Sequence, residues 1–387
     1  MNVGKEIMPP VAKPIKIDKV NVISGFAANN ALVGEDVRVI YKGFFHSDQK
    51  EFYEYIEKLS NIYLNQYLVN NIHNFLIIIH PDLTVDLYIN EVPILLKIIS
   101  KRDILAQEAV TINDIADITE LRFADYVYIK ENYKLIFCFK VGWKFGLYFD
   151  FHNHTNPHYS LNLQELWKEF GYYYKFLLFQ KEYSILHNRP LFKEMFMDGW
   201  FPFIRLMGGD YRKLAKIYEN RFDFENSINK FIDSFNQNKI KSIINSWWRK
   251  QIIKDKEAII KAGINAYLQN NQDGYINCIK NIYPEIEGII RMSYTNEKKK
   301  NPSMKDLMNF VEEKAKNKFV SIESLGFPNE FYRYLKDVFF KDFNLLANDC
   351  SLSRHTTSHG IAKSEDYTKI KALQSILILD QIVFSIF

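Results

Sequence analysis

Cysteine, proline and glycine are all scarce in this chain of 387 residues, which has 3, 11 and 15 of them. The cysteines, Cys138, Cys278 and Cys350, lie far apart and form no CxxC pair. This pattern argues against a disulfide framework and for a reducing compartment. The shortage of proline and glycine leaves little room for flexible linkers, so we expect large buried cores.

Long apolar runs are also missing. Residues 1–19 hold prolines and lysines but no apolar signal segment, and we expect them to form an N-terminal arm. The most apolar stretch, 376–387, is too short to span a bilayer and contains Asp380. The sequence therefore predicts a soluble, cytoplasmic protein with no membrane partner.

The surplus of positive charge is small, at +4, so a polyanionic partner such as RNA is permitted but not required. Aromatic residues are abundant instead, with 31 Phe and 24 Tyr, and they favour well-packed cores. At roughly 150 residues per domain, the length suggests two or three domains.

Residues 20–150 predict an α+β domain with a mostly antiparallel sheet. The apolar run 75–80 and the alternating run 84–89 are typical of strands. A hairpin is predicted over 126–139, around Glu131 and Asn132, and another strand over 144–150. Helical spacing predicts a helix within 49–68.

Helical periodicity dominates after a polar stretch at 151–158. We expect a connecting helical segment over 151–200 and a mainly α-helical bundle over 201–387. Within it, Asp273-Gly274 predicts a turn, and Pro284 predicts a bend in the following helix. Ser303 predicts a helix N-cap with Asp306 at the capping-box position.

The window 352–360 reads LSRHTTSHG and holds two of the nine histidines. Arg354 is a permanent cation suited to holding a phosphate. His355 and His359 can exchange protons near neutral pH. A cation beside a proton-transfer group is the minimum equipment for metal-free cleavage of a phosphodiester.

Geometry restricts this interpretation. In a regular helix Arg354 and His359 would lie about 140° apart around the axis. They converge only if a helix begins or ends between them, or if two chains contribute, and Gly360 fits a helix end. His355 and His359 could share a helix face and bind zinc, but the window lacks the glutamate of HExxH and a third ligand. We therefore predict no metal and no cofactor here.

Arg354 and His359 match the R-x4-H motif of HEPN (higher-eukaryote and prokaryote nucleotide-binding) domains. The segment also resembles the end of many bacterial HEPN-like proteins, in which an Arg-polar pair and His-Gly precede a Tyr-Thr step into a final apolar helix. Here those elements are Arg354-His355, His359-Gly360, Tyr367-Thr368 and the run ending near Asp380. The resemblance covers roughly residues 200–387, including Tyr275 and 284–288 upstream.

This resemblance implies a metal-independent endoribonuclease that forms a homodimer with a composite site. By analogy, His359 would be the general acid/base, Arg354 would bind the scissile phosphate and His355 would assist. Such proteins are often toxins or antiviral, abortive-infection effectors, and a regulatory partner or antitoxin would fit that role. The 20–150 domain would then sense, regulate or recruit.

Other interpretations stay open. The helical domain can instead be a non-catalytic dimerisation or nucleotide-binding module, with Arg354 paired to a carboxylate, for which Glu285 or Glu287 is available. The lysine run Lys298, Lys299 and Lys300 predicts contact with the RNA backbone or, alternatively, a solvated loop. Trp247 and Trp248 could stack on nucleobases or belong to the core. The histidines His152, His154 and His158 could bind a metal or simply form a polar loop.

Overall fold

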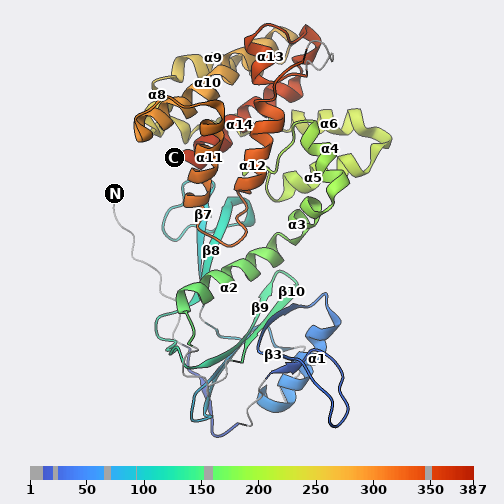
Figure 1. Cartoon of the computed structure of the whole chain (residues 1–387), viewed down its shortest axis with the longest axis vertical. Helices are drawn as coiled ribbons and strands as arrows, with labels where there is room; N and C mark the ends of the chain where they lie inside the picture. Colours follow the sequence, from blue (N-terminus) through green and yellow to red (C-terminus); the bar gives the residue numbers. More distant parts are fainter. Residues whose placement is uncertain (1–11, 21–24, 65–70, 93, 152–159, 345–350) are drawn as a thin grey trace. The chain divides into compact units, whose positions relative to one another are not determined.

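The computed structural model describes residues 12–20, 25–64, 71–92, 94–151, 160–344 and 351–387. The chain splits into two compact units. The first unit comprises Met1–Ile98, Leu105–Glu108 and Ile118–Gln180. The second comprises Ile99–Ile104, Ala109–Asp117 and Lys181–Phe387. Most strands belong to the first and most helices to the second, which confirms the predicted order of a strand-containing part followed by a helical part (Figure 1).

An antiparallel sheet of six strands forms the centre of the first unit. In spatial order the strands are β1 (Ile15–Ile17), β6 (Val85–Ile89), β5 (Phe75–Ile79), β9 (Lys134–Val141), β10 (Lys144–Asp150) and β4 (Lys42–His46). There are also two two-stranded sheets. In one, β2 (Phe26–Ala27) pairs antiparallel with β3 (Val39–Ile40), and in the other, β7 (Ile94–Ser100) pairs with β8 (Ile115–Phe123). The predicted strands at 75–80, 84–89 and 144–150 are confirmed.

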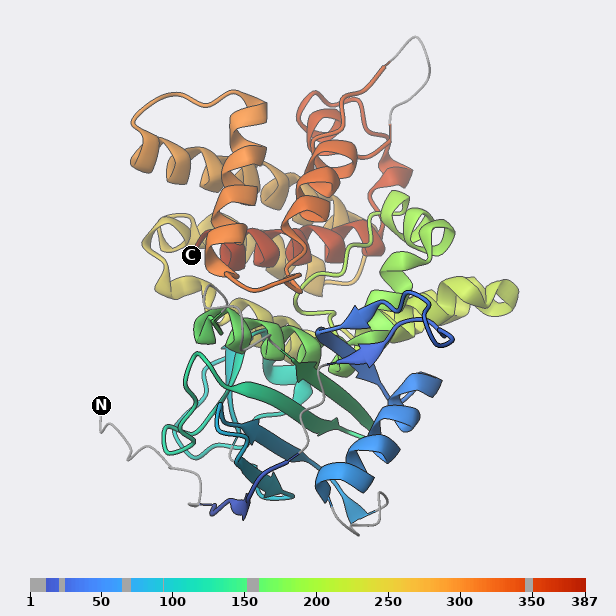
Figure 2. The same ribbon diagram turned by 60° about the horizontal axis from the view of Figure 1, so that its bottom comes forward.

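A helix covers each face of this sheet. Successive side chains of a strand point to opposite faces, so Ile77 packs in the core shared with α1 (Lys50–Leu59), and Ile78 packs in the core shared with α2 (Leu163–Leu178). All five residues of β5 are buried, as expected for a central strand covered on both sides. Figure 2 shows α2 lying across the sheet. A π-helical turn, Ser60–Leu64, extends α1.

The hairpin predicted over 126–139 is wrong. No strand precedes β9 within residues 124–133 of the described chain, and the hairpin joins β9 to β10 instead. Its turn contains Gly142, whose φ of +62° is easily reached only by glycine. Glu131 and Asn132 lie in a polar turn, and the residues that precede this turn form no strand.

The second unit is a helical bundle around two long helices, α10 (Gln272–Lys298) and α14 (Lys369–Ile386), which pack against each other (Figure 1). Residues 372–383 of α14 are buried on every side, so this helix is the core of the bundle. The remaining helices are α3 (Gln180–His187), α4 (Arg189–Met197), α5 (Gly209–Glu219), α6 (Phe224–Asp233), α7 (Gln237–Ile244), α8 (Gln251–Lys254), α9 (Glu257–Leu268), α11 (Met304–Lys318), α12 (Pro328–Tyr334) and α13 (Arg354–Ser358). Short 3-10 turns lie at Ile112–Asp114, Arg221–Asp223, Trp247–Arg249 and Ser364–Asp366, and a π-helical turn, Leu335–Phe339, extends α12.

Capping decides where α10 and α11 begin. The predicted turn at Asp273-Gly274 is wrong, because the Asn271 side chain accepts a hydrogen bond from the backbone N–H of Gly274 at 2.8 Å and starts α10 there. Pro284 lies inside α10 without ending it. The capping box of Ser303 with Asp306 at the start of α11 is confirmed.

Candidate functional site

The predicted motif forms a helix of only five residues, α13. Ser353 caps its start: its hydroxyl accepts from the backbone N–H of Thr356 at 3.2 Å and donates to the Lys341 carbonyl at 2.8 Å. Gly360, with a φ of +68°, ends it. Arg354 is therefore the first residue of the helix, and His359 lies just beyond its last. This satisfies the geometric condition that a helix begins or ends between the two.

The structure brings the two histidines together. The rings of His355 and His359 are stacked with centroids 6.4 Å apart and planes 14° from parallel. Phe340 packs edge-on against His355 at 6.5 Å, and Phe343 contacts His359 at 5.6 Å. Nδ1 of His355 also lies 3.6 Å from a carboxylate oxygen of the exposed Asp342. Two imidazoles one helical turn apart thus lie side by side along α13, the ring of His359 in the more exposed position.

Arg354 points to a different partner. Its Nε forms an ion pair with Glu287 of α10, whose carboxylate is 6% exposed. The other oxygen of Glu287 accepts from Nε of Arg291 at 2.6 Å, and Arg291 donates to the Pro302 carbonyl at 3.0 Å. One buried carboxylate therefore balances two guanidiniums, and it fixes α13 against the middle of α10. The prediction that a nearby glutamate neutralises Arg354 is borne out by this ion pair.

Arg354 and His359 do not converge as closely as the two histidines do. Among the contacts of the described residues, none joins the guanidinium of Arg354 to the imidazole of His359. The side chain of Arg354 is 22% exposed, so part of the guanidinium reaches solvent. The arrangement supplies two proton-transfer groups together and a cation beside them, one residue before His355.

The lysine run lies at the C-terminal end of α10, where Lys298 is the last helical residue. Lys298 is about three turns from Glu287, or roughly 16 Å along the axis. Its ammonium pairs with Glu313 at 3.2 Å, and this hydrogen bond raises the pKa of Lys298. Lys299 ends the helix in a left-handed conformation, with a φ of 54°. Lys300 lies over the ring of Tyr294 at 5.8 Å. The three lysines are therefore exposed but are not adjacent to α13.

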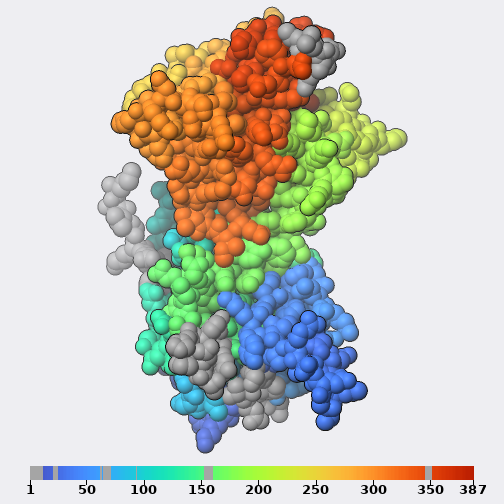
Figure 3. Space-filling view, in the orientation of Figure 1, coloured from blue at the N-terminus to red at the C-terminus, as the bar shows by residue number. Residues whose placement is uncertain are grey.

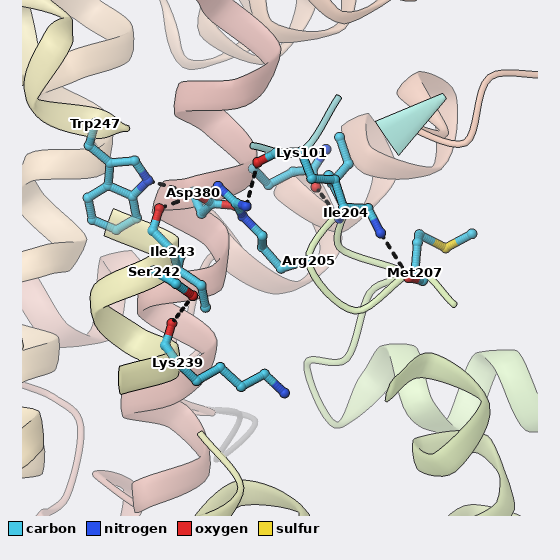
Figure 4. A network of polar contacts seen from close by, with 10 residues as sticks. Lys101, Ile204, Arg205, Met207, Lys239, Ser242, Ile243, Trp247 and Asp380 are labelled. Atoms are coloured by element: carbon cyan, nitrogen blue, oxygen red, sulfur yellow. Dashed lines mark hydrogen bonds and ion pairs between the residues drawn. The ribbon is translucent and has the colours of Figure 1, made fainter. Parts of the chain in front are cut away.

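A buried polar network at Asp380 gave no clear signal in the sequence. Asp380 of α14 accepts hydrogen bonds from the indole N–H of Trp247 at 2.7 Å and from Nε of Arg205 at 2.9 Å (Figure 4). Arg205 also donates to the Lys101 carbonyl at 2.7 Å, and the Lys101 ammonium donates to the Met207 carbonyl at 2.9 Å. Because Trp247 is fully buried here, the core interpretation of that tryptophan is confirmed.

The remaining candidates have simpler places. Glu285 pairs with Lys256, so it forms no carboxylate pair with Glu287. Cys278 is a buried free thiol, and burial raises its pKa to about 12. The three predicted loop histidines and one cysteine lie outside the described residues: His152, His154, His158 and Cys350. Asp342 and Phe343, which flank the histidine pair, carry no motif that sequence analysis can recognise.

Comparison with known proteins assigns the chain to no family. The sequence matches no protein-family model and no curated protein, and the structure matches no solved structure. Among the described residues, no helix is both long and apolar enough to cross a bilayer. Within that same part of the chain, no three His, Cys, Asp or Glu side chains cluster as a metal site would require.

Proposed function

We propose that the second unit is a HEPN-type, metal-independent endoribonuclease. The observation that carries this proposal is the stacked pair of His355 and His359 along α13, with Arg354 directly before His355 in sequence. Two imidazoles close together can transfer two protons in one reaction, which cleavage of RNA through its own 2′-hydroxyl requires. The R-x4-H resemblance supports the same activity.

In this mechanism one imidazole removes the proton of the ribose 2′-hydroxyl, and the resulting oxygen attacks the adjacent phosphorus. The bond from phosphorus to the 5′-oxygen breaks, and an imidazolium gives that oxygen a proton. The products are a 2′,3′-cyclic phosphate and a 5′-hydroxyl. We assign His359, the more exposed ring, as the general acid/base and His355 as the assisting group.

Arg354 would stabilise the negative charge that develops on the phosphate. The ion pair with Glu287 is made by Nε, so the terminal nitrogens of the guanidinium are the groups proposed to bind phosphate. Glu287 then sets the direction of the guanidinium. The three lysines at 298–300 would bind the RNA backbone at a distance from the scissile bond.

Cleavage of labelled RNA by the purified protein in EDTA tests this proposal. We expect wild-type protein to cleave, and Arg354→Ala and His359→Ala each to lower the rate by about 100-fold or more. Far-ultraviolet circular dichroism should show unchanged helicity in both variants. Absence of cleavage for every RNA tried, or equal cleavage by wild type and both variants, would contradict the proposal.

A second candidate function is a non-catalytic helical module for dimerisation or nucleotide binding. The ion-pair network of Arg354, Glu287 and Arg291 favours this function, because holding α13 against α10 is a sufficient role for Arg354. Under this alternative, Arg354→Ala lowers the stability of the protein, and neither wild type nor the variant cleaves RNA.

The biological setting follows from the resemblance alone. We propose a homodimeric toxin or antiviral, abortive-infection effector whose activity is held off by a regulatory partner or antitoxin. The first unit would supply sensing or recruitment. Expression of wild-type protein in a bacterium should then arrest growth, and His359→Ala should relieve the arrest.

A further inference from the structure

A large cavity lies in the second unit, away from α13. Its volume is about 1090 Å³, slightly above the usual range for small-molecule sites. It is lined by α3, α4, the end of α11, the loop at 319–327 and α12, and it is open to solvent. Figure 3 shows the surface of α3 and α4 (green) beside the orange to red surface of α11 and α12. No residue of 354–359 lines it, so it is a site separate from the histidine pair.

One face of α4 carries both cations and aromatic rings into this cavity. Arg189, Phe192, Lys193 and Phe196 all line it, and they recur at the spacing of a single helical stripe. Phe192 is half-buried, so part of its ring remains available for a ligand. A planar aromatic group is the natural partner for such a ring beside a guanidinium.

The cavity is positively charged. Four cations line it, against two carboxylates, those of Glu323 and Glu330. Three of these cations are Arg189, Lys193 and Arg333 of α12. Among the described residues, none of the three forms an ion pair. The fourth cation is on α11 and pairs with Glu312. Unpaired cations gathered from two helices around one cavity favour a ligand with several negative charges.

The opposite wall is held firmly in place. The Tyr183 hydroxyl donates to the Glu323 carbonyl at 3.0 Å, and the Tyr183 ring meets Phe327 edge-on at 6.2 Å. Glu323 and Phe327 both adopt left-handed backbone conformations, with φ of 45° and 42°. Such conformations are strained in residues other than glycine and persist where surrounding contacts impose them. These contacts fix the position of this wall of the cavity.

We propose that this cavity binds a nucleoside di- or triphosphate. The base packs against Phe192, and the phosphates are held by Arg189, Lys193 and Arg333. The carboxylates of Glu323 and Glu330 accept hydrogen bonds from the ribose hydroxyls or from exocyclic amino groups of the base. This site requires no RNA cleavage by the histidine pair.

Isothermal titration calorimetry on the full chain tests the proposal with ATP and GTP, and separately with inorganic triphosphate and adenosine. We expect saturable binding of at least one nucleotide, with triphosphate and adenosine each binding more weakly. Arg189→Gln/Lys193→Gln should raise Kd by about tenfold or more, because two charge-assisted contacts are lost. Phe192→Leu keeps the apolar volume and should weaken the nucleotide but not triphosphate.

A matched control removes two exposed lysines of the same unit that lie outside the cavity, in Lys241→Gln/Lys254→Gln. This variant should bind the nucleotide as wild type does. The proposal is overturned if neither nucleotide binds at millimolar concentration, if both double variants bind equally, or if triphosphate binds as tightly as the nucleotide. Because no RNA is present, the result is independent of the proposed ribonuclease activity.

Discussion

Glu287 balances two guanidiniums with one carboxylate that is 6% exposed. Glu287→Gln keeps the shape and removes the charge, which leaves Arg291 and Arg354 without their partner. We expect the free energy of unfolding to fall by about 1–3 kcal/mol, below the value for a fully buried pair because both arginines are partly exposed. Urea denaturation followed by circular dichroism measures the change.

The control for this prediction is Glu312→Gln on the neighbouring α11. Glu312 pairs with Lys316 one helical turn away, in an ion pair whose lysine side chain is 52% exposed. Its loss should cost only about 0.3–0.5 kcal/mol. Equal effects of the two substitutions would show that the Glu287 network does not hold α13 in place.

Lys101 is a buried ammonium whose effect depends on pH. Burial lowers its pKa from 10.5 to about 8, although it donates to the Met207 carbonyl. Between these two values the unfolded chain binds more protons than the folded chain, so stability rises with pH in that window. The stability of wild type relative to Lys101→Met should therefore increase by about 2–3 kcal/mol from pH 8 to pH 10.5. Denaturant titrations at several pH values measure this, and a constant difference would contradict the assignment.

Some residue partnerships can be predicted from sequence and others cannot. The sequence offered Glu285 or Glu287 as a carboxylate partner for Arg354, and the structure pairs Arg354 with Glu287. The bond between Asp380 and Trp247 joins positions remote in sequence and depends on how α14 packs, so no local pattern indicates it. The contact of Asp342 with His355 is equally invisible.

At the scale of elements, α13 depends on its terminal glycine. Gly360 has a φ of +68°, and a Cβ there would meet open space, so Gly360→Ala acts through backbone strain alone. We expect a loss of about 1 kcal/mol in stability and a larger loss of RNA cleavage, because the strain falls on His359, the preceding residue. Thermal unfolding and a cleavage assay measure the two effects.

Gly142 offers a matched comparison in the β9–β10 turn. Its φ is +62°, and open space surrounds the position of its Cβ as well. Gly142→Ala should lower stability by about as much as Gly360→Ala while cleavage stays unchanged. If both variants lose the same activity, the effect of Gly360 is not specific to the histidine site.

Element types were more predictable than element ends. The strands at β5 and β6 follow from their apolar and alternating patterns, and the α11 capping box follows from Ser303 and Asp306. Within the helical segment expected over 151–200, α2 and α3 are separated at Phe179, where the sequence has no proline or glycine. Phe179 is completely buried at this break, and tertiary burial of this kind is not visible in local periodicity.

At the scale of the whole molecule, a composite site requires two copies of the chain. The side chains of Leu373, Ile376 and Leu377 in α14 are completely buried within one chain, so that helix is core and does not form a dimer interface on that face. A dimer must then use another surface, and we propose the face that carries α13. Sedimentation velocity should show a dimer, and the cleavage rate per chain should fall on dilution. A strict monomer with full activity would exclude the composite site.

The order of the two structural classes along the chain was predictable from composition and periodicity, because strands and helices repeat with different periods. The boundaries between the two units were not predictable in this way. Segments 99–104 and 109–117 belong to the helical unit although they come from the strand-rich part of the sequence. Local patterns contain no information about such long-range association.

The central claim is that His359 and His355 transfer protons during attack by the ribose 2′-hydroxyl. The chemical ends of the products test it most directly. An RNA and its fully 2′-O-methylated copy are incubated with wild-type protein in EDTA, and the fragments are analysed by mass spectrometry. We predict 2′,3′-cyclic phosphate and 5′-hydroxyl ends from the RNA and no cleavage of the methylated copy, whereas cleavage of both, or 5′-phosphate ends, would contradict the claim.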